Sequence, residues 1–112
     1  MLPLYVTSGE PAGIGPDICL SLASRADQRP VVVLADKAML QKRAEILGLD
    51  IALLDYAGQA EPAGKGRIYV EHVPLSNDVV LGQLDAGNAA YVLEQLRRSA
   101  DYALSGKSVG VA

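Results

Sequence analysis

Five short apolar runs constrain the fold of this 112-residue chain more than any other feature of its sequence. The run PVVVLA at 30–35 is continuously apolar, which is typical of a strand buried on both faces of a parallel sheet. Further runs lie at 3–8, 51–56, 67–73 and 108–112. Because helical patterns separate several of these runs, the sequence predicts an α/β fold with a mostly parallel sheet flanked by helices.

Three helices are expected between the strands. Pro16 and Asp17 favour the first turn of a helix. Its apolar repeat is Ile14, Ile18, Leu22 and Ala26, which recur at helical spacing. Asp36 is the expected N-cap of a second helix, and Gly48 its expected end.

The third helix is the longest and is expected to begin at Ala89 and to be capped by Gly106. Glu94 and Arg98 are spaced to form an i,i+4 ion pair on it. Its apolar face is marked by Ala89, Val92, Leu93, Leu96, Ala100, Ala103 and Leu104.

Length and composition favour one domain, a single α/β unit over residues 1–112. Phe and Trp are absent, which predicts a core of Leu, Ile, Val and Ala. The slight acidic excess, 13 acidic against 10 basic residues, and the lack of a basic run make nucleic acid an unexpected partner. A single cysteine and the absence of a signal or membrane segment at the N-terminus favour a cytoplasmic protein without membrane partners.

The loop GEPAGIGPD at 9–17 follows the first strand and precedes the first helix, a position where main-chain N–H groups can hold an anion. Its spacing fits neither the G-x-G-x-x-G dinucleotide pattern nor a P-loop. Two interpretations stay open. The loop is either a stiff structural turn or the wall of a ligand site, with Glu10 placed to hydrogen-bond.

Other candidates favour structural roles. The SGKS sequence at 105–108 lacks the first P-loop glycine and follows a helix, and Lys107 is expected to be a solvated cation. His72 is the only histidine, so no metal-ligand spacing is present, and Cys19 lies on an apolar helix side without a base. The polar segment around Asn77, Asp78 and Asp85 is either a cleft wall or a solvated loop with a helix N-cap.

Three stretches together carry a resemblance to a known family: VTSGEPAGIGPDICLSLA, VVVLADKAMLQKRAEILGLDI and VPLSNDVVLGQLDAGNAAYVLEQLRRSADYALSGK. They closely resemble the N-terminal part of the 4-hydroxythreonine-4-phosphate dehydrogenases, from about Tyr5 to Ala112. The resemblance implies the first part of a fold similar to isocitrate and isopropylmalate dehydrogenases, with two α/β domains and a cleft between them.

The family resemblance also implies a function. Such enzymes use NAD and a divalent metal to oxidise and decarboxylate 4-phosphooxy-L-threonine in pyridoxal 5'-phosphate biosynthesis, and they work as homodimers. The residues carried over to a cofactor or substrate site are Gly9, Glu10, Pro11, Gly13 and Gly15, with Ile14 in the same motif. No catalytic or metal-binding residue is carried over, because the family's metal-binding histidines have no counterpart in this sequence.

Two alternatives stay open at the level of sequence. One is a related dehydrogenase that acts on another hydroxy acid or on a dihydrodiol, and the other is a non-catalytic ligand-binding module.

We expect the chain to be an N-terminal fragment, inactive alone, because it stops within the apolar run at 108–112. An open sheet edge there predicts marginal stability or self-association. The melting temperature is therefore expected to rise with protein concentration in calorimetry. A monomer with a sharp melt that does not change with concentration would contradict this expectation.

Overall fold

The computed structural model describes residues 2–24, 29–75, 88–108 and 110–111. In chain order the elements are β1 (Leu4–Thr7), α1 (Gly15–Ser21), the short 3-10 helix η1 (Leu22–Ser24), β2 (Val31–Ala35), α2 (Lys37–Ile46), β3 (Ala52–Asp55), β4 (Arg67–His72), α3 (Ala89–Leu104) and β5 (Gly110–Val111). The expected strands and helices are confirmed, with bounds that differ by a few residues. No helix in these described ranges is long and apolar enough to cross a membrane.

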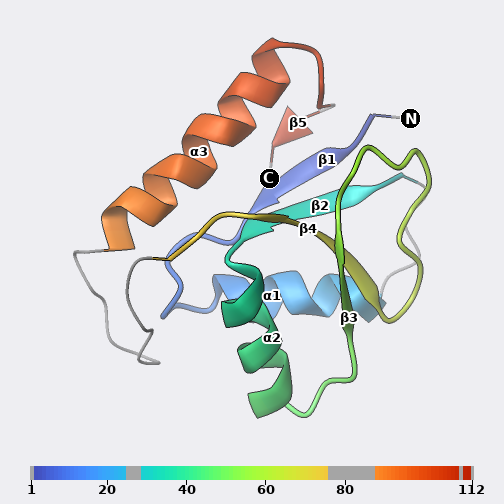
Figure 1. Cartoon of the computed structure of the whole chain (residues 1–112), viewed down its shortest axis with the longest axis vertical. Coiled ribbons are helices and arrows are strands. Elements are labelled where there is room, and N and C mark those ends of the chain that lie inside the picture. Colours follow the sequence, from blue (N-terminus) through green and yellow to red (C-terminus); the bar gives the residue numbers. More distant parts are fainter. Residues whose placement is uncertain (1, 25–28, 76–87, 109, 112) are drawn as a thin grey trace.

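All strand pairs in the five-stranded sheet are parallel, and the strand order is β3-β4-β2-β1-β5 (Figure 1). Val33 in β2 is the register partner of Val6 in β1 and of Val70 in β4. The predicted parallel α/β sheet is therefore confirmed. Because the strands are parallel, the carboxyl ends of β1, β2, β3 and β4 meet at one edge of the sheet.

One face of the sheet is covered by α1 and α2 and is aliphatic. Val33 and Ala35 of β2 and Ile68 and Val70 of β4 point to this face. They pack against the helix residues Cys19, Leu20, Leu40 and Ala44. All of these side chains are almost completely buried, so this half of the core is the one that the composition predicted.

The opposite face is lined by tyrosine, which corrects the prediction of an aliphatic core. Val32 and Leu34 alternate with Val33 and Ala35 along β2, so they point to this second face. All five tyrosines of the chain gather there: Tyr5, Tyr69 and Tyr91 are buried, and Tyr56 and Tyr102 are partly buried. The rings of Tyr5 and Tyr102 lie 4.6 Å apart, centroid to centroid. Tyrosine thus supplies the large side chains that the missing Phe and Trp would otherwise provide.

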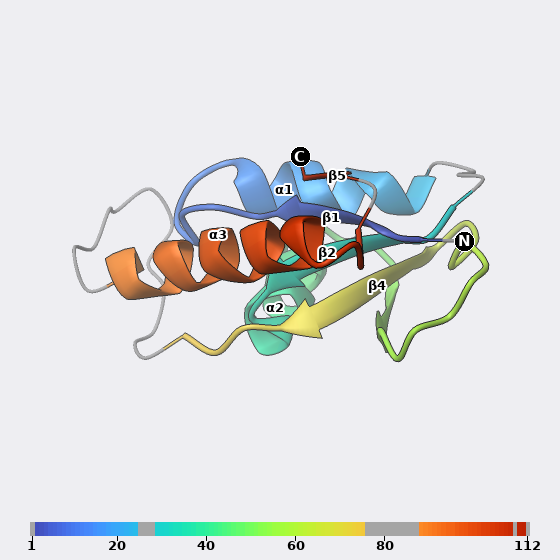
Figure 2. The same ribbon diagram turned by 90° about the horizontal axis from the view of Figure 1, so that it is seen from above.

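Helix α3 runs along β1 and β5 in both ribbon views, but it packs with an unexpected face (Figures 1 and 2). Tyr91, Gln95 and Ser99 are its buried residues. Leu93, Leu96 and Leu104 of the predicted apolar face are 64%, 49% and 88% exposed. Val92 of that face packs against the tyrosine-lined side of the sheet, but most of the face points away from it, because hydrogen bonds described below hold the polar side of α3 against the sheet.

A similar difference occurs on α1. Ile14 and Ile18 of the predicted apolar repeat are exposed, while Pro16, Cys19 and Leu20 are buried. Position 26, the last of that repeat, lies outside the described residues.

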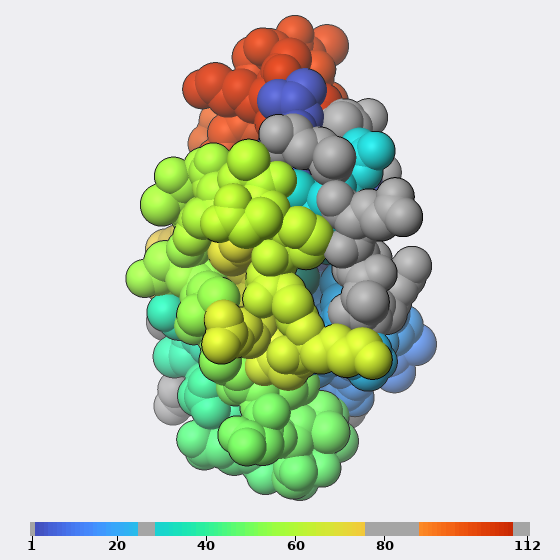
Figure 3. Space-filling view, turned by 90° about the vertical axis from the view of Figure 1, so that its right-hand side faces the viewer, coloured from blue at the N-terminus to red at the C-terminus, as the bar shows by residue number. Residues whose placement is uncertain are grey.

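The connection between β3 and β4 contains no helix. Its residues form the central part of the face seen in Figure 3, drawn in yellow-green. Tyr56 and Ala63 from this connection pack on the tyrosine-lined face of the sheet, so the connection covers the part that α3 does not reach.

The predicted ends of the helices are confirmed. Gly48 follows α2 and Gly106 follows α3, both with positive φ angles of 70° and 75°. This is the left-handed conformation in which glycine commonly ends a helix. The predicted Glu94–Arg98 pair is also present, with Arg98 Nε 2.8 Å from Glu94 Oε1.

Asp36 is the N-cap of α2, as predicted, and it has a second role. Its Oδ1 atom accepts a hydrogen bond from the Met39 N–H (3.0 Å), and its Oδ2 atom accepts one from the Leu75 N–H (2.9 Å). One carboxylate therefore joins the start of α2 to the segment that follows β4.

We expect Asp36→Ala to lower the free energy of unfolding by about 2 kcal/mol, because both N–H groups lose a charged acceptor. Urea titration of the two proteins measures the difference. The control is Asp55→Ala, which removes an exposed ion pair with Lys37 and is expected to cost less than about 1 kcal/mol. Equal losses in the two variants would contradict the role given to Asp36.

Candidate functional site

The loop that leaves β1 lies where an open α/β sheet usually binds its ligands. β1 has β2 on one side and β5 on the other, so the order of strands reverses at its carboxyl end. Ligands of such sheets bind in the crevice outside this point. The segment from Ser8 to Ile14, between β1 and α1, occupies this position.

Gln95 of α3 binds both main-chain polar groups of Gly9. The Gly9 N–H donates to Gln95 Oε1 (3.0 Å), and Gln95 Nε2 donates to the Gly9 carbonyl oxygen (3.3 Å). Gln95 is completely buried. Its carboxamide thus makes the pair of hydrogen bonds that a neighbouring strand would make and fixes the start of the loop.

A chain of hydrogen bonds links Ser8 to the end of β2. The Ser8 hydroxyl donates to the Leu34 carbonyl oxygen (3.0 Å) and lies 3.3 Å from the Tyr91 hydroxyl. The Asp36 N–H donates to the Tyr91 hydroxyl (2.9 Å). The Ser8 hydroxyl also lies 3.3 Å from Gln95 Oε1, a second acceptor for its single proton, so Ser8 connects β2 to both Tyr91 and Gln95 of α3. Burial also raises the pKa of Tyr91, which keeps this hydroxyl protonated.

Arg43 of α2 binds the main chain in the middle of the loop. Its guanidinium lies 2.7 Å from the Gly13 carbonyl oxygen, 3.5 Å from that of Pro11, and 2.7 Å from the Asp17 carboxylate. The Arg43 side chain is buried, so its charge is compensated by the loop and by the first turn of α1. This contact turns the carbonyl groups of Pro11 and Gly13 toward the protein interior.

Gly15 is required by close packing at the start of α1. A Cβ atom at this position would lie 2.0 Å from the Ser8 carbonyl oxygen, far inside contact distance. Only a residue without a side chain allows α1 to begin this close to the end of β1.

Glu10 is the loop's charged side chain and is half-buried. Its Oε1 atom accepts a hydrogen bond from Asn88 Nδ2 (3.3 Å) and a long one from the Ala12 N–H (3.5 Å). Asn88 stands immediately before α3 and is buried. Glu10 therefore connects the loop to the start of α3 and remains partly accessible at the sheet edge.

These contacts bear on the two interpretations of the loop, a structural turn or the wall of a ligand site. The N–H groups of Gly9, Ala12 and Gly13 all donate within the protein, the last of them to the Glu10 carbonyl oxygen (3.1 Å). A phosphate-binding loop needs such groups free and pointing at the ligand. These three N–H groups are therefore used within the protein and brace the loop, while the Glu10 side chain stays partly accessible and the Ile14 side chain is exposed.

The other sequence candidates lie apart from this loop. His72 is exposed at the end of β4, and its Nδ1 atom accepts a hydrogen bond from the Lys37 N–H (3.1 Å). Cys19 lies on the buried side of α1, and burial raises the pKa of its thiol to about 11, so the nucleophilic thiolate is scarce at neutral pH. Lys107 is exposed, as expected. The polar segment at 77, 78 and 85 lies outside the described residues.

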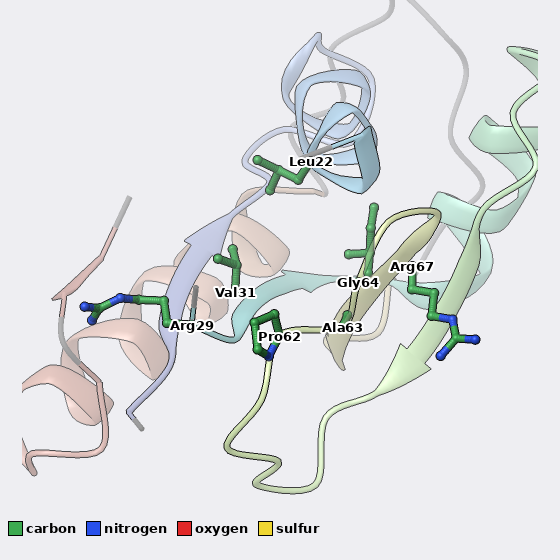
Figure 4. A pocket seen from close by; sticks show the side chains of 8 residues that line it. Leu22, Arg29, Val31, Pro62, Ala63, Gly64 and Arg67 are labelled. Atoms are coloured by element: carbon green, nitrogen blue, oxygen red, sulfur yellow. The ribbon is translucent and has the colours of Figure 1, made fainter. Parts of the chain in front are cut away.

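A shallow hollow lies at the opposite end of the sheet, by the first residues of β2 and β4 (Figure 4). Leu22, Val31 and Ile68 line it, and Arg29 and Arg67 lie at its rim. The two arginine side chains point away from the hollow in opposite directions (Figure 4). It therefore offers no converging charge for an anionic ligand.

Sequence reasoning identified the loop but missed the two side chains that brace it. Gln95 and Arg43 are polar residues in the middle of helices, where solvent exposure is the usual interpretation. A weak signal was present for Gln95, because Tyr91, Gln95 and Ser99 recur at a spacing of four and form a second face on the helix.

Comparison with known proteins bears out the predicted resemblance. The chain is 49% identical to the 4-hydroxythreonine-4-phosphate dehydrogenase of Stutzerimonas stutzeri strain A1501, over 97% of this chain and 34% of that protein. It is 48% identical to the Pseudomonas aeruginosa enzyme of the same name, over 98% of this chain and 34% of that protein. The chain matches no protein-family model.

A solved structure agrees with these sequence relatives. The crystal structure of 4-hydroxythreonine-4-phosphate dehydrogenase from Klebsiella pneumoniae superimposes with a TM-score of 0.79 and 30% identity, over 99% of this chain and 36% of that protein. The chain therefore spans about a third of the length of the relatives that it matches.

Because α1 begins so close to Ser8, adding one methyl group at Gly15 is expected to lower the stability of the protein strongly. Gly15→Ala is expected to lower the free energy of unfolding by at least about 2 kcal/mol, because α1 must move away from Ser8. The matched control is Gly13→Ala, whose added Cβ atom would lie 3.4 Å from the Glu10 carbonyl oxygen, an ordinary contact. Urea titration in which the two alanine variants lose equal stability would contradict the packing described for this turn.

Proposed function

We propose that the chain supplies part of an NAD-dependent, divalent-metal-dependent dehydrogenase that oxidises and decarboxylates 4-phosphooxy-L-threonine in pyridoxal 5'-phosphate biosynthesis. The observation that carries the proposal is the identity of 48–49% to enzymes of that name along nearly the whole chain. The proposed enzyme is a cytoplasmic homodimer. Its activity requires the two thirds of the relatives' length that this chain does not match, and the chain alone is inactive.

Within this enzyme the braced loop forms a rigid wall of the ligand site. The loop residues Gly9, Pro11, Gly13 and Gly15 give it its shape, and Glu10 is the group that contacts a ligand. A carboxylate accepts hydrogen bonds, so Glu10 is suited to a hydroxyl or ammonium group of the substrate or to a ribose hydroxyl of NAD. Because the N–H groups of Gly9, Ala12 and Gly13 are already used, the proposal places no phosphate group on them.

The metal ligands of the proposed enzyme lie in the part of the relatives' length that this chain does not match. Among the residues that the structure describes, no three His, Cys, Asp or Glu side chains gather where they could hold a metal ion. A divalent metal in such a reaction polarises the carbonyl group that forms on oxidation. The role proposed for the described residues is to shape the site and to bind the ligand.

The proposal is tested by completing the chain. We would join residues 1–112 to the unmatched part of the Stutzerimonas stutzeri relative and measure NADH formation by absorbance. NADH is expected with 4-phosphooxy-L-threonine, NAD and a divalent metal, and none is expected from the isolated chain. A folded fusion that acts only on another hydroxy acid or on a dihydrodiol would overturn the proposed substrate.

The role of Glu10 predicts a specific change in this fusion. Glu10→Ala is expected to raise the KM of either the substrate or NAD about 10- to 100-fold, since one hydrogen bond to a charged group is lost. Glu10→Gln keeps an acceptor for Asn88 Nδ2 and removes the charge, so it separates ligand binding from bracing of the loop.

The matched control is Glu45→Ala, which removes an exposed carboxylate of α2 and is expected to leave both KM values unchanged. If Glu10→Ala leaves both KM values and the turnover unchanged, Glu10 does not touch a ligand and the loop is only a turn.

A further inference from the structure

The outer side of α3 carries an apolar stripe that nothing in the described structure covers. Three leucines of the stripe are strongly exposed: Leu93, Leu96 and Leu104, at 64%, 49% and 88%. Ala89 and Ala100, which extend the stripe along the same side of the helix, are exposed as well. Single exposed leucines are common on protein surfaces, but a continuous stripe on one side of a helix marks a contact surface.

The position of the stripe follows from what holds the other side of α3. Tyr91, Gln95 and Ser99 are buried toward the sheet, and Gln95 is fixed by its two hydrogen bonds to Gly9. At 100° per residue, Leu93 and Ala100 lie roughly opposite Gln95 on the helix. The helix cannot turn its leucines onto the sheet without breaking the buried contacts of Gln95. The stripe is therefore a constant feature of the surface, built into the packing of α3.

Charged side chains border the stripe on one side only. Arg97 lies 2.6 Å from Glu94 Oε1 and 2.8 Å from Asp101 Oδ2, so these exposed charges pair along the helix. Hydrogen bonds from Arg97 and Arg98 lower the pKa of Glu94 to about 2, which keeps the row of charges ionised at neutral pH. Since the three groups satisfy one another, they do not call for a charged partner.

We propose that this stripe packs against an apolar helix face in the two thirds of the relatives' length that this chain does not match. Spacings of three and four along Leu93, Leu96, Ala100 and Leu104 are those with which helix ridges fit into the grooves of a neighbouring helix. α3 covers β1 and β5 with its buried side, and the stripe faces away from the sheet, so the proposed helix packs over the outer side of α3.

The length of the relatives favours a helix from their unmatched part, rather than a second copy of this chain, as the partner of the stripe. The Klebsiella pneumoniae structure matches 99% of this chain with only 36% of its own length, so a large part of that protein is available to cover α3. The proposal depends on this length and on the stripe, and it is independent of which substrate the enzyme acts on.

The test compares one pair of substitutions in two contexts. Leu93→Gln combined with Leu96→Gln is made in the isolated chain and in the fusion to the unmatched part of the Stutzerimonas stutzeri relative. The matched control is Arg97→Gln, which introduces the same side chain on the same helix beside the stripe. Melting temperatures are measured by calorimetry, with sedimentation to record the oligomeric state.

The double variant is expected to lower the melting temperature of the fusion by about 5 °C or more, because two buried leucines become polar. In the isolated chain it is expected to change the melting temperature by less than about 2 °C, since both positions are in water there. Arg97→Gln is expected to have a small effect in both contexts.

Two results would overturn the proposal. One is a fusion whose melting temperature falls no more than that of the isolated chain. The other is an isolated chain that sediments as a dimer and becomes a monomer on substitution, while the fusion is unaffected, which would assign the stripe to a second copy. If the double variant of the fusion does not fold, the single variant Leu104→Gln is measured in the same two contexts with the same criteria.

Discussion

Two hydrogen bonds between the Gln95 carboxamide and the main chain of Gly9 determine how the rest of this structure is arranged. A buried N–H or carbonyl group without a partner costs about 1–3 kcal/mol, so losing this pair would be expensive for a small domain. The cost is avoided only when α3 turns its polar side to the sheet. The loop after β1 is then fixed, and the leucines of α3 face outward.

The same contact explains the character of the loop. Gln95 fixes its first residue, Arg43 binds the carbonyl groups in its middle, and Gly15 lets α1 begin against Ser8. A loop braced at three points loses little entropy when a ligand binds, which suits a preorganised wall of a site. The N–H groups of Gly9, Ala12 and Gly13 are used within the protein, which favours recognition by a side chain. In the proposed enzyme that task falls to Glu10.

The fold could be predicted from the sequence because its signals are local. Strand runs, the Asp36 cap and the glycines after α2 and α3 depend on neighbouring residues, and all are confirmed. The orientation of α3 could not be predicted, because its apolar pattern does not tell which side of the helix meets this sheet. Which side meets this sheet depends on Gln95 reaching Gly9, 86 positions away in sequence. The tyrosine-lined face was not predicted either, because composition gives the number of tyrosines but not where they lie in the fold.

The most direct test of this account is the exchange of the Gln95 side-chain amide protons in solution, measured by NMR on the isolated chain. With Gln95 bound to Gly9 in a dry environment, its Nε2 protons are predicted to exchange far more slowly than those of the exposed Gln41, and to show proton–proton contacts to Gly9. Exchange as fast as that of Gln41, without contacts to Gly9, would contradict the central role of this pair.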